Sequence, residues 1–175
     1  MPKSSTAAPT APAAAAAAAA ATDGERPSFP LDVLRSHADW LARAAREACR
    51  QHRRCGELCE RGDLDPLELN GVLDLAALAD QQLAQAAEAY AKSGAKLSPD
   101  GDERGWWHQA NALWLAAREH VRRHSLGDRL SKRIGVEHSA DRLTELHVEF
   151  ALEASAMLSL QQAADAYCKA RPAAL

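Results

Sequence analysis

Apolar residues recur every three or four positions over most of the chain after residue 30, and this period predicts amphipathic helices. Four helical segments are expected, at about 30–59, 66–93, 105–124 and 139–170. Each segment has one apolar face, built mainly from alanine and leucine, and one polar face. In the last segment the apolar face is expected to bury Leu143, Leu146, Phe150, Met157 and Leu160.

The residues between these segments predict where the helices begin and end. Asp65 followed by Pro66 is typical of an N-cap and a first helical position, and Ser139 is a natural N-cap for the last helix. Gly127 and Gly135 interrupt a short apolar segment after the third helix, so we expect that helix to end near residue 124.

The composition agrees with an all-α fold. Apolar residues make up 47% of the chain and are mostly alanine and leucine, whereas aromatic residues make up 5%. Alanine and leucine favour helices, and short connections between long helices favour antiparallel neighbours. We therefore predict an antiparallel up-and-down four-helix bundle formed by residues 28–175.

Residues 1–27 differ from the rest of the chain. They contain several prolines and the unbroken alanine run 13–21, without an amphipathic pattern. We expect a disordered tail, and the alternative is a targeting segment, because Lys3 precedes the alanine run. No segment has the roughly 20 strongly apolar residues of a membrane span. Three of the four cysteines lie within residues 49–59, which indicates reduced thiols and a cytoplasmic protein.

A stripe of cysteine and histidine marks the end of the first predicted helix. Cys49, His52, Cys55 and Cys59 are spaced by 3, 3 and 4 residues, so they lie along one side of a helix. Cys49 falls at the edge of the apolar face, and the other three fall on it. Thiolate and imidazole ligands together suit zinc or copper.

In an up-and-down bundle, this end of the first helix meets the end of the third and the start of the fourth. The candidate metal ligands are therefore inward-facing residues from three segments: His52, Cys55, Cys59, His120, His124 and His147. The alternative is a structural role, because cysteine behaves as a small hydrophobic residue and histidine can bond the last carbonyls of a helix.

A basic stretch suggests a second kind of site. The candidate partner-binding residues are one tryptophan and four arginines: Trp107, Arg118, Arg122, Arg129 and Arg133. Residues 118–142 also resemble a helix-turn-helix around Gly135, but Asp141 stands where that motif buries an apolar residue. The net charge of −3 argues against a nucleic-acid binder driven by overall charge.

The motifs of several enzyme classes are missing from the sequence. It contains no P-loop, no GxSxG, no CxxC and no Glu-x-x-His pair of a di-iron bundle. We therefore expect a non-catalytic binding bundle with a Cys/His site for zinc or copper at one end. One alternative is a cofactor-free structural or protein-interaction module, whose partner is another protein or a second copy of the chain. The other is a nucleic-acid binder acting through residues 118–142.

Overall fold

The computed structural model describes residues 31–61, 65–93, 103–134 and 139–171. In these ranges it contains four helices and no strand: α1 (Leu31–Arg61), α2 (Pro66–Lys92), α3 (Glu103–Ile134) and α4 (Ala140–Ala170). The predicted all-α four-helix bundle is confirmed. The expected tail, residues 1–27, and the glycine at 135 lie outside the described residues.

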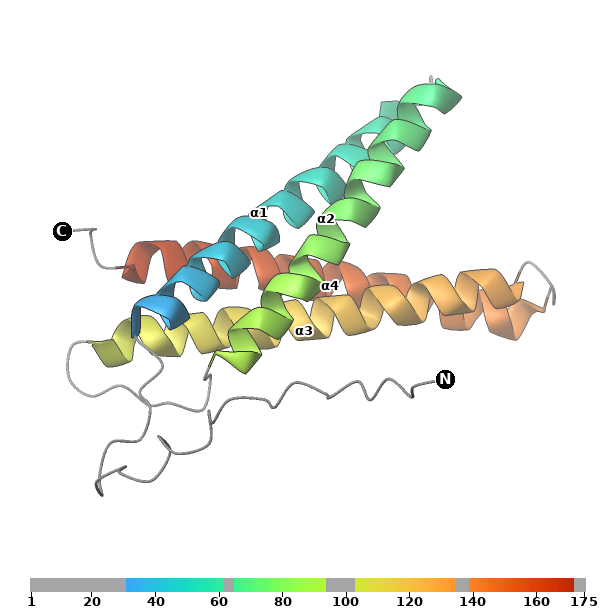
Figure 1. Ribbon diagram of the computed structural model, residues 1–175. Coiled ribbons are helices and arrows are strands. Elements are labelled where there is room, and N and C mark those ends of the chain that lie inside the picture. The colour runs from blue at the N-terminus through green and yellow to red at the C-terminus, as the bar shows by residue number, and fades with distance from the viewer. Residues whose placement is uncertain (1–30, 62–64, 94–102, 135–138, 172–175) are drawn as a thin grey trace, which may run out of the picture.

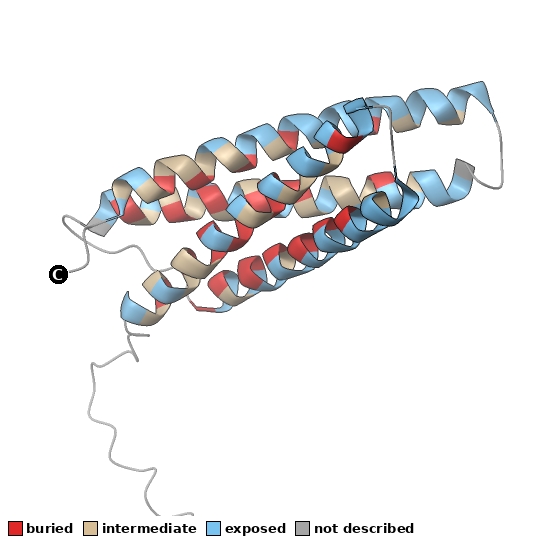
Figure 2. Ribbon diagram, turned by 90° about the horizontal axis from the view of Figure 1, so that it is seen from above, coloured by how far each residue is buried: buried red, intermediate tan, exposed pale blue. Residues whose placement is uncertain are grey.

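The four helices form two antiparallel hairpins that cross each other (Figure 1). Helices α1 and α2 make one hairpin, helices α3 and α4 make the other, and packing is more extensive within a hairpin than between hairpins. The hairpins approach each other along part of their length and diverge toward their turns. Buried residues concentrate where the hairpins cross, and the divergent ends are largely exposed (Figure 2).

Leucine, alanine and tyrosine fill the core between the hairpins. Leu41, Leu83, Leu113, Leu160 and Tyr90 are all fully buried. Burying one leucine stabilises the fold by about 1.5–3 kcal/mol relative to leaving it exposed. The alanines of α1 and α3 on the same faces are small, so the crossing helices can approach closely.

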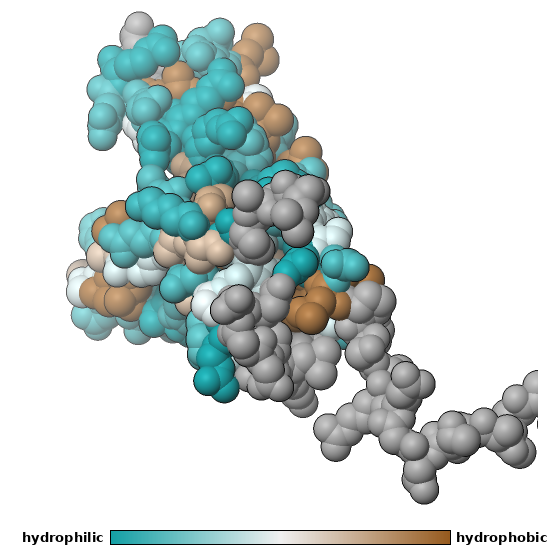
Figure 3. Space-filling model, turned by 90° about the vertical axis from the view of Figure 1, so that its left-hand side faces the viewer, coloured by the Kyte–Doolittle hydropathy of each residue, from teal (hydrophilic) through white to brown (hydrophobic). Residues whose placement is uncertain are grey.

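The outer surface is mixed in character. On the face shown in Figure 3, hydrophilic side chains cover much of the described surface, with separate hydrophobic patches among them. Within the described residues, no helix is both long enough and apolar enough to cross a membrane.

Both predicted N-caps are confirmed. The Asp65 carboxylate accepts a hydrogen bond from the amide of Leu67 at 2.9 Å, and the Ser139 hydroxyl accepts one from the amide of Arg142 at 3.2 Å. Each cap satisfies a backbone N–H that has no partner inside its helix.

Replacing the first of these caps by alanine is expected to destabilise the protein modestly. Asp65→Ala removes the acceptor for Leu67, so the free energy of unfolding should fall by about 1 kcal/mol. Urea denaturation followed by circular dichroism measures this change. Asp65→Asn keeps a capping oxygen and is the control. Equal losses in the two variants would contradict a capping role.

The predicted end of the third helix is wrong. Helix α3 does not stop near residue 124 but continues through Gly127 to Ile134. The glycine is buried against α4, and a Cβ built there would lie 3.2 Å from Glu153 Oε2 and 3.6 Å from Phe150 Cε1. Gly127 therefore permits a close approach of two helices rather than a turn.

The predicted burial of the first half of α4 is also partly wrong. Leu143 and Phe150 are 47% and 46% exposed, because the α1–α2 hairpin has diverged from α4 at this point. Glu149 is instead the buried residue of this turn, and it accepts hydrogen bonds from Arg123 at 3.1 and 3.2 Å. Helix crossing thus changes which face of α4 is covered.

Helices α3 and α4 lie side by side and antiparallel in both ribbon views (Figures 1 and 2). A helix-turn-helix instead joins two helices at about 90–120°. The expected resemblance of residues 118–142 to that motif is therefore not matched by the arrangement of the helices.

Candidate functional site

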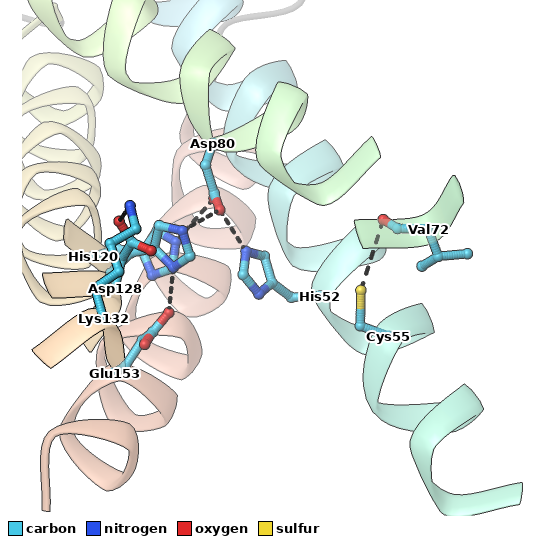
Figure 4. Close-up of polar contacts among 9 residues, drawn as sticks. His52, Cys55, Val72, Asp80, His120, Asp128, Lys132 and Glu153 are labelled. Carbon is cyan, nitrogen blue, oxygen red and sulfur yellow. Dashed lines mark hydrogen bonds and ion pairs between the residues drawn. The ribbon is translucent and has the colours of Figure 1, made fainter. Parts of the chain in front are cut away.

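A cluster of five polar side chains lies between the two hairpins, and all four helices contribute to it (Figure 4). We call it the His/Asp cluster. It consists of His52 from α1, Asp80 from α2, His120 and His124 from α3, and Glu153 from α4. Polar groups from four separate elements therefore meet at one point inside a bundle whose core is otherwise mainly apolar.

Asp80 stands at the centre of the cluster. Its Oδ2 accepts a hydrogen bond from His52 Nε2 at 2.8 Å and lies 3.5 Å from His124 Nε2. Its Oδ1 accepts a hydrogen bond from His120 Nε2 at 3.2 Å. The Asp80 side chain is only 10% exposed, so the three imidazoles replace most of the water that a carboxylate would otherwise bind.

His124 is held from both ring nitrogens. Its Nδ1 donates a hydrogen bond to Glu153 Oε1 at 2.7 Å, while its Nε2 faces Asp80. Gly127, one turn further along α3, leaves room for the Glu153 carboxylate beside the helix. Contacts from α2 and α4 to its two ring nitrogens therefore orient the His124 ring.

The three imidazole rings also contact one another. The His52 ring lies edge-on to the rings of His120 and His124, with centroid distances of 5.5 and 5.7 Å. The rings of His120 and His124 are stacked at 6.1 Å. His120 is fully buried, and its Nδ1 has no hydrogen-bond partner in the part of the chain that the structure describes.

Burial and hydrogen bonding act in opposite directions on the ionisation of the cluster. Burial by itself would raise the pKa of Asp80, but the hydrogen bonds from His120 and His52 outweigh it and hold that pKa well below its usual range. The hydrogen bond to Glu153 raises the pKa of His124, against the effect of burial. The centre is therefore an ionised carboxylate among imidazoles.

Three residues of the cluster present atoms of the type that binds metal ions. Among the described residues, one atom each of His52, Asp80 and His124 lie within 4.8 Å of one another. His52 and His124 belong to the ligand set expected from the sequence, and Asp80 does not. His120, also expected, lies beside this group with its Nε2 on the other oxygen of Asp80.

The remaining predicted ligands do not join this group. The thiol of Cys55 donates to the carbonyl of Val72 at 3.8 Å, on the side away from Asp80 (Figure 4). Cys59 and His147 are exposed. All four cysteines are free thiols. Cys49 is buried, and its thiol donates to the carbonyl of Met157 at 4.0 Å.

The predicted partner-binding residues are distributed along α3. Trp107 packs partly buried against the core, and the Arg118 guanidinium lies 4.9 Å from the centre of the Trp114 ring. Arg122 bonds Glu119 on its own helix. Arg129 donates to the carbonyl of Ser125, and Arg133 is exposed. These side chains do not converge on one point.

Sequence reasoning missed the roles of Asp80 and Glu153. A signal for Asp80 exists, because it is the one acidic residue on a face of α2 that otherwise carries Ala76, Ala79 and Leu83. A carboxylate at such a position needs a buried partner. Glu153 sits at the flank of the buried face of α4, and only the close approach at Gly127 explains its contact with His124.

We compared the chain with protein-family models, curated proteins and solved structures. No protein-family model, no curated protein and no solved structure matches the chain. The chemistry of the cluster is therefore the main indication of function.

Proposed function

We propose that the protein is a metal-binding four-helix bundle whose His/Asp cluster binds one divalent transition-metal ion, with zinc as the reference ion. His52 Nε2, Asp80 Oδ2 and His124 Nε2 are the proposed ligands. The observation that carries the proposal is that these three residues, from three different helices, each bring a ligand atom within 4.8 Å of the other two.

The distances between these atoms are close to those that a metal requires. Zinc binds imidazole nitrogen and carboxylate oxygen at about 2.0–2.2 Å, so two ligand atoms of a tetrahedral site lie roughly 3.3 Å apart. The oxygen of Asp80 lies 2.8 Å from His52 Nε2 and 3.5 Å from His124 Nε2. The two imidazole–carboxylate distances therefore lie within about half an ångström of this value, and an ion between these atoms would take the place of the bridging protons.

The contacts around the three ligands have the character of a supporting shell. A histidine that binds a metal usually donates its other N–H to a carboxylate, which fixes the tautomer and the ring orientation. Glu153 accepts that hydrogen bond from His124, and His120 donates to the Asp80 oxygen that faces away from the other two ligands. In this proposal, Asp80 Oδ2 binds the ion and Asp80 Oδ1 accepts the hydrogen bond from His120.

The donor set narrows the choice of ion. Two imidazoles and one carboxylate suit Zn²⁺, Cu²⁺ and other first-row divalent ions, whereas Cu⁺ prefers thiolates. Three protein ligands leave one position of a tetrahedral ion open, which is the arrangement of sites that bind a further molecule rather than purely structural ones.

Metal titration tests the proposal. Protein purified without an affinity tag and stripped with a chelator is expected to bind one Zn²⁺ per chain by calorimetry, and to give a visible absorption band with Co²⁺. His52→Ala and His124→Ala should each weaken binding at least a hundredfold, because each removes a ligand. Glu153→Gln should weaken it about tenfold or more, because it keeps an acceptor oxygen for His124 but removes the negative charge of that acceptor.

Cys59→Ser is the matched control, because this exposed thiol lies outside the group of three ligand atoms. It should leave the affinity unchanged. Substoichiometric uptake by the native chain, or loss of binding in Cys59→Ser with retention in His124→Ala, would exclude the proposed site.

A cofactor-free cluster is the second candidate. The observation that favours it is the hydrogen bonding within the cluster, where both oxygens of Asp80 already accept from imidazoles. In that case the cluster only joins the hairpins, and the chain takes up no zinc or cobalt under the conditions above.

A further inference from the structure

A groove between α1 and α4 opens beside the His/Asp cluster. Its volume is about 480 Å³, within the range of about 300–1,000 Å³ typical of small-molecule sites. Residues of both helices line it, among them Cys49, His52 and Arg53 of α1 and Phe150, Glu153 and Met157 of α4. One proposed ligand, His52, and the supporting residue Glu153 line the groove, so the groove adjoins the proposed metal site.

One wall of the groove is apolar and uncharged. Phe150, Ala154 and Met157 lie in successive turns of α4, and Cys49 faces them from α1. Burial raises the pKa of Cys49 to about 11, so its thiol stays neutral and adds to this wall. Phe150 is exposed and lines the groove, so its ring is accessible to a ligand there.

The α1 side of the groove also carries a cationic side chain, Arg53. The Arg53 guanidinium donates to the side-chain oxygen of Gln161 at 3.2 Å, and this partner is a neutral amide. The neighbouring acid Asp165 already pairs with Arg46 at 3.3 Å, and Glu153 accepts from His124. The carboxylates near the groove are therefore engaged, and Arg53 can receive an anion.

We infer that the groove binds a small amphipathic carboxylate, with its head between Arg53 and the open position of the metal and its apolar chain along Phe150 and Met157. The inference rests on the proposed function, because the metal supplies the second attraction for the carboxylate. An apolar wall, a cation and a Lewis acid in one groove select this class of ligand over neutral or cationic molecules.

Hexanoate and acetate are suitable probes, because they share a head group and differ in the apolar chain. Hexanoate should shift the absorption band of the Co²⁺-loaded protein and saturate, and it should bind at least tenfold more tightly than acetate, since burial of each CH₂ group is favourable. The metal-free protein should bind hexanoate at least tenfold more weakly.

Two pairs of variants locate the ligand. Arg53→Gln should weaken hexanoate binding at least tenfold, while Arg54→Gln, the same change one residue further along α1 and outside the groove, should not. Phe150→Ala should weaken hexanoate binding without changing acetate binding. Leu152→Ala, on an exposed part of the same helix, is its control.

The outcomes separate the two proposals. A cobalt band that neither acid perturbs, equal affinities for hexanoate and acetate, or equal effects of Arg53→Gln and Arg54→Gln would overturn the carboxylate site and leave the metal site standing. Binding of hexanoate that is independent of metal would also overturn it. Absence of a cobalt band in the native protein would overturn both proposals.

Discussion

The Asp80→Asn substitution is expected to lower the free energy of unfolding of the metal-free protein by about 3 kcal/mol. Asp80 is buried, and its two oxygens accept from His52 and His120 and lie next to His124. Asparagine has one acceptor oxygen, and its NH₂ group would face an imidazole donor. The fully buried His120 cannot turn to water to compensate.

Urea denaturation at pH 6 in the presence of a chelator measures this loss without a contribution from metal. Asp74→Asn is the matched control, because it makes the same change at an exposed position of α2. It should alter the free energy of unfolding by less than about 0.5 kcal/mol. Similar effects of the two substitutions would show that Asp80 is not the centre of a buried network.

The stability of the metal-free protein is expected to be greatest between about pH 4 and pH 6.5 and to fall on both sides. The folded-state pKa of Asp80 lies below its ordinary value of 3.8, so its contribution is present above pH 3.8 and is lost as the pH falls further. The folded-state pKa of His124 lies above 6.5, so its contribution is complete below pH 6.5 and is lost as the pH rises through the folded value.

The acid side should show the larger effect, because protonation of Asp80 removes the same acceptor that Asp80→Asn removes. Thermal unfolding measured in chelator at half-unit steps from pH 2 to pH 9 gives the profile. Asp80→Asn should flatten the acid side, and His124→Asn should flatten the alkaline side. An acid side that is as steep in Asp80→Asn as in the native chain would assign it to other carboxylates, such as Glu119, whose pKa two neighbouring arginines lower to about 2.

Local patterns were sufficient to predict the helices. The helical period and the caps at Asp65 and Ser139 depend on residues close together in the sequence, and these predictions are confirmed. The end of α3 was predicted wrongly because Gly127 has two physical uses, a turn or a close helix contact. Only the neighbouring helix α4 decides between them.

The candidate site could be predicted only in part, for a related reason. His52, His120 and His124 were expected to converge because an up-and-down bundle brings their helix ends together. The place of Asp80 depends on how the two hairpins cross, and a heptad-like pattern within one helix does not encode that angle. The same angle leaves Phe150 exposed, whereas the contact of Cys55 with Val72 lies within the α1–α2 hairpin.

The division of the cluster between the hairpins also has a mechanical consequence. His52 and Asp80 come from one hairpin, and His120, His124 and Glu153 come from the other. The part of α1 from His52 to its end at Arg61 is about 14 Å long, at a rise of about 1.5 Å per residue. A rotation of ten degrees about the cluster would move the end of α1 by about 2 Å. An ion bound in the cluster would therefore fix the angle between the two hairpins.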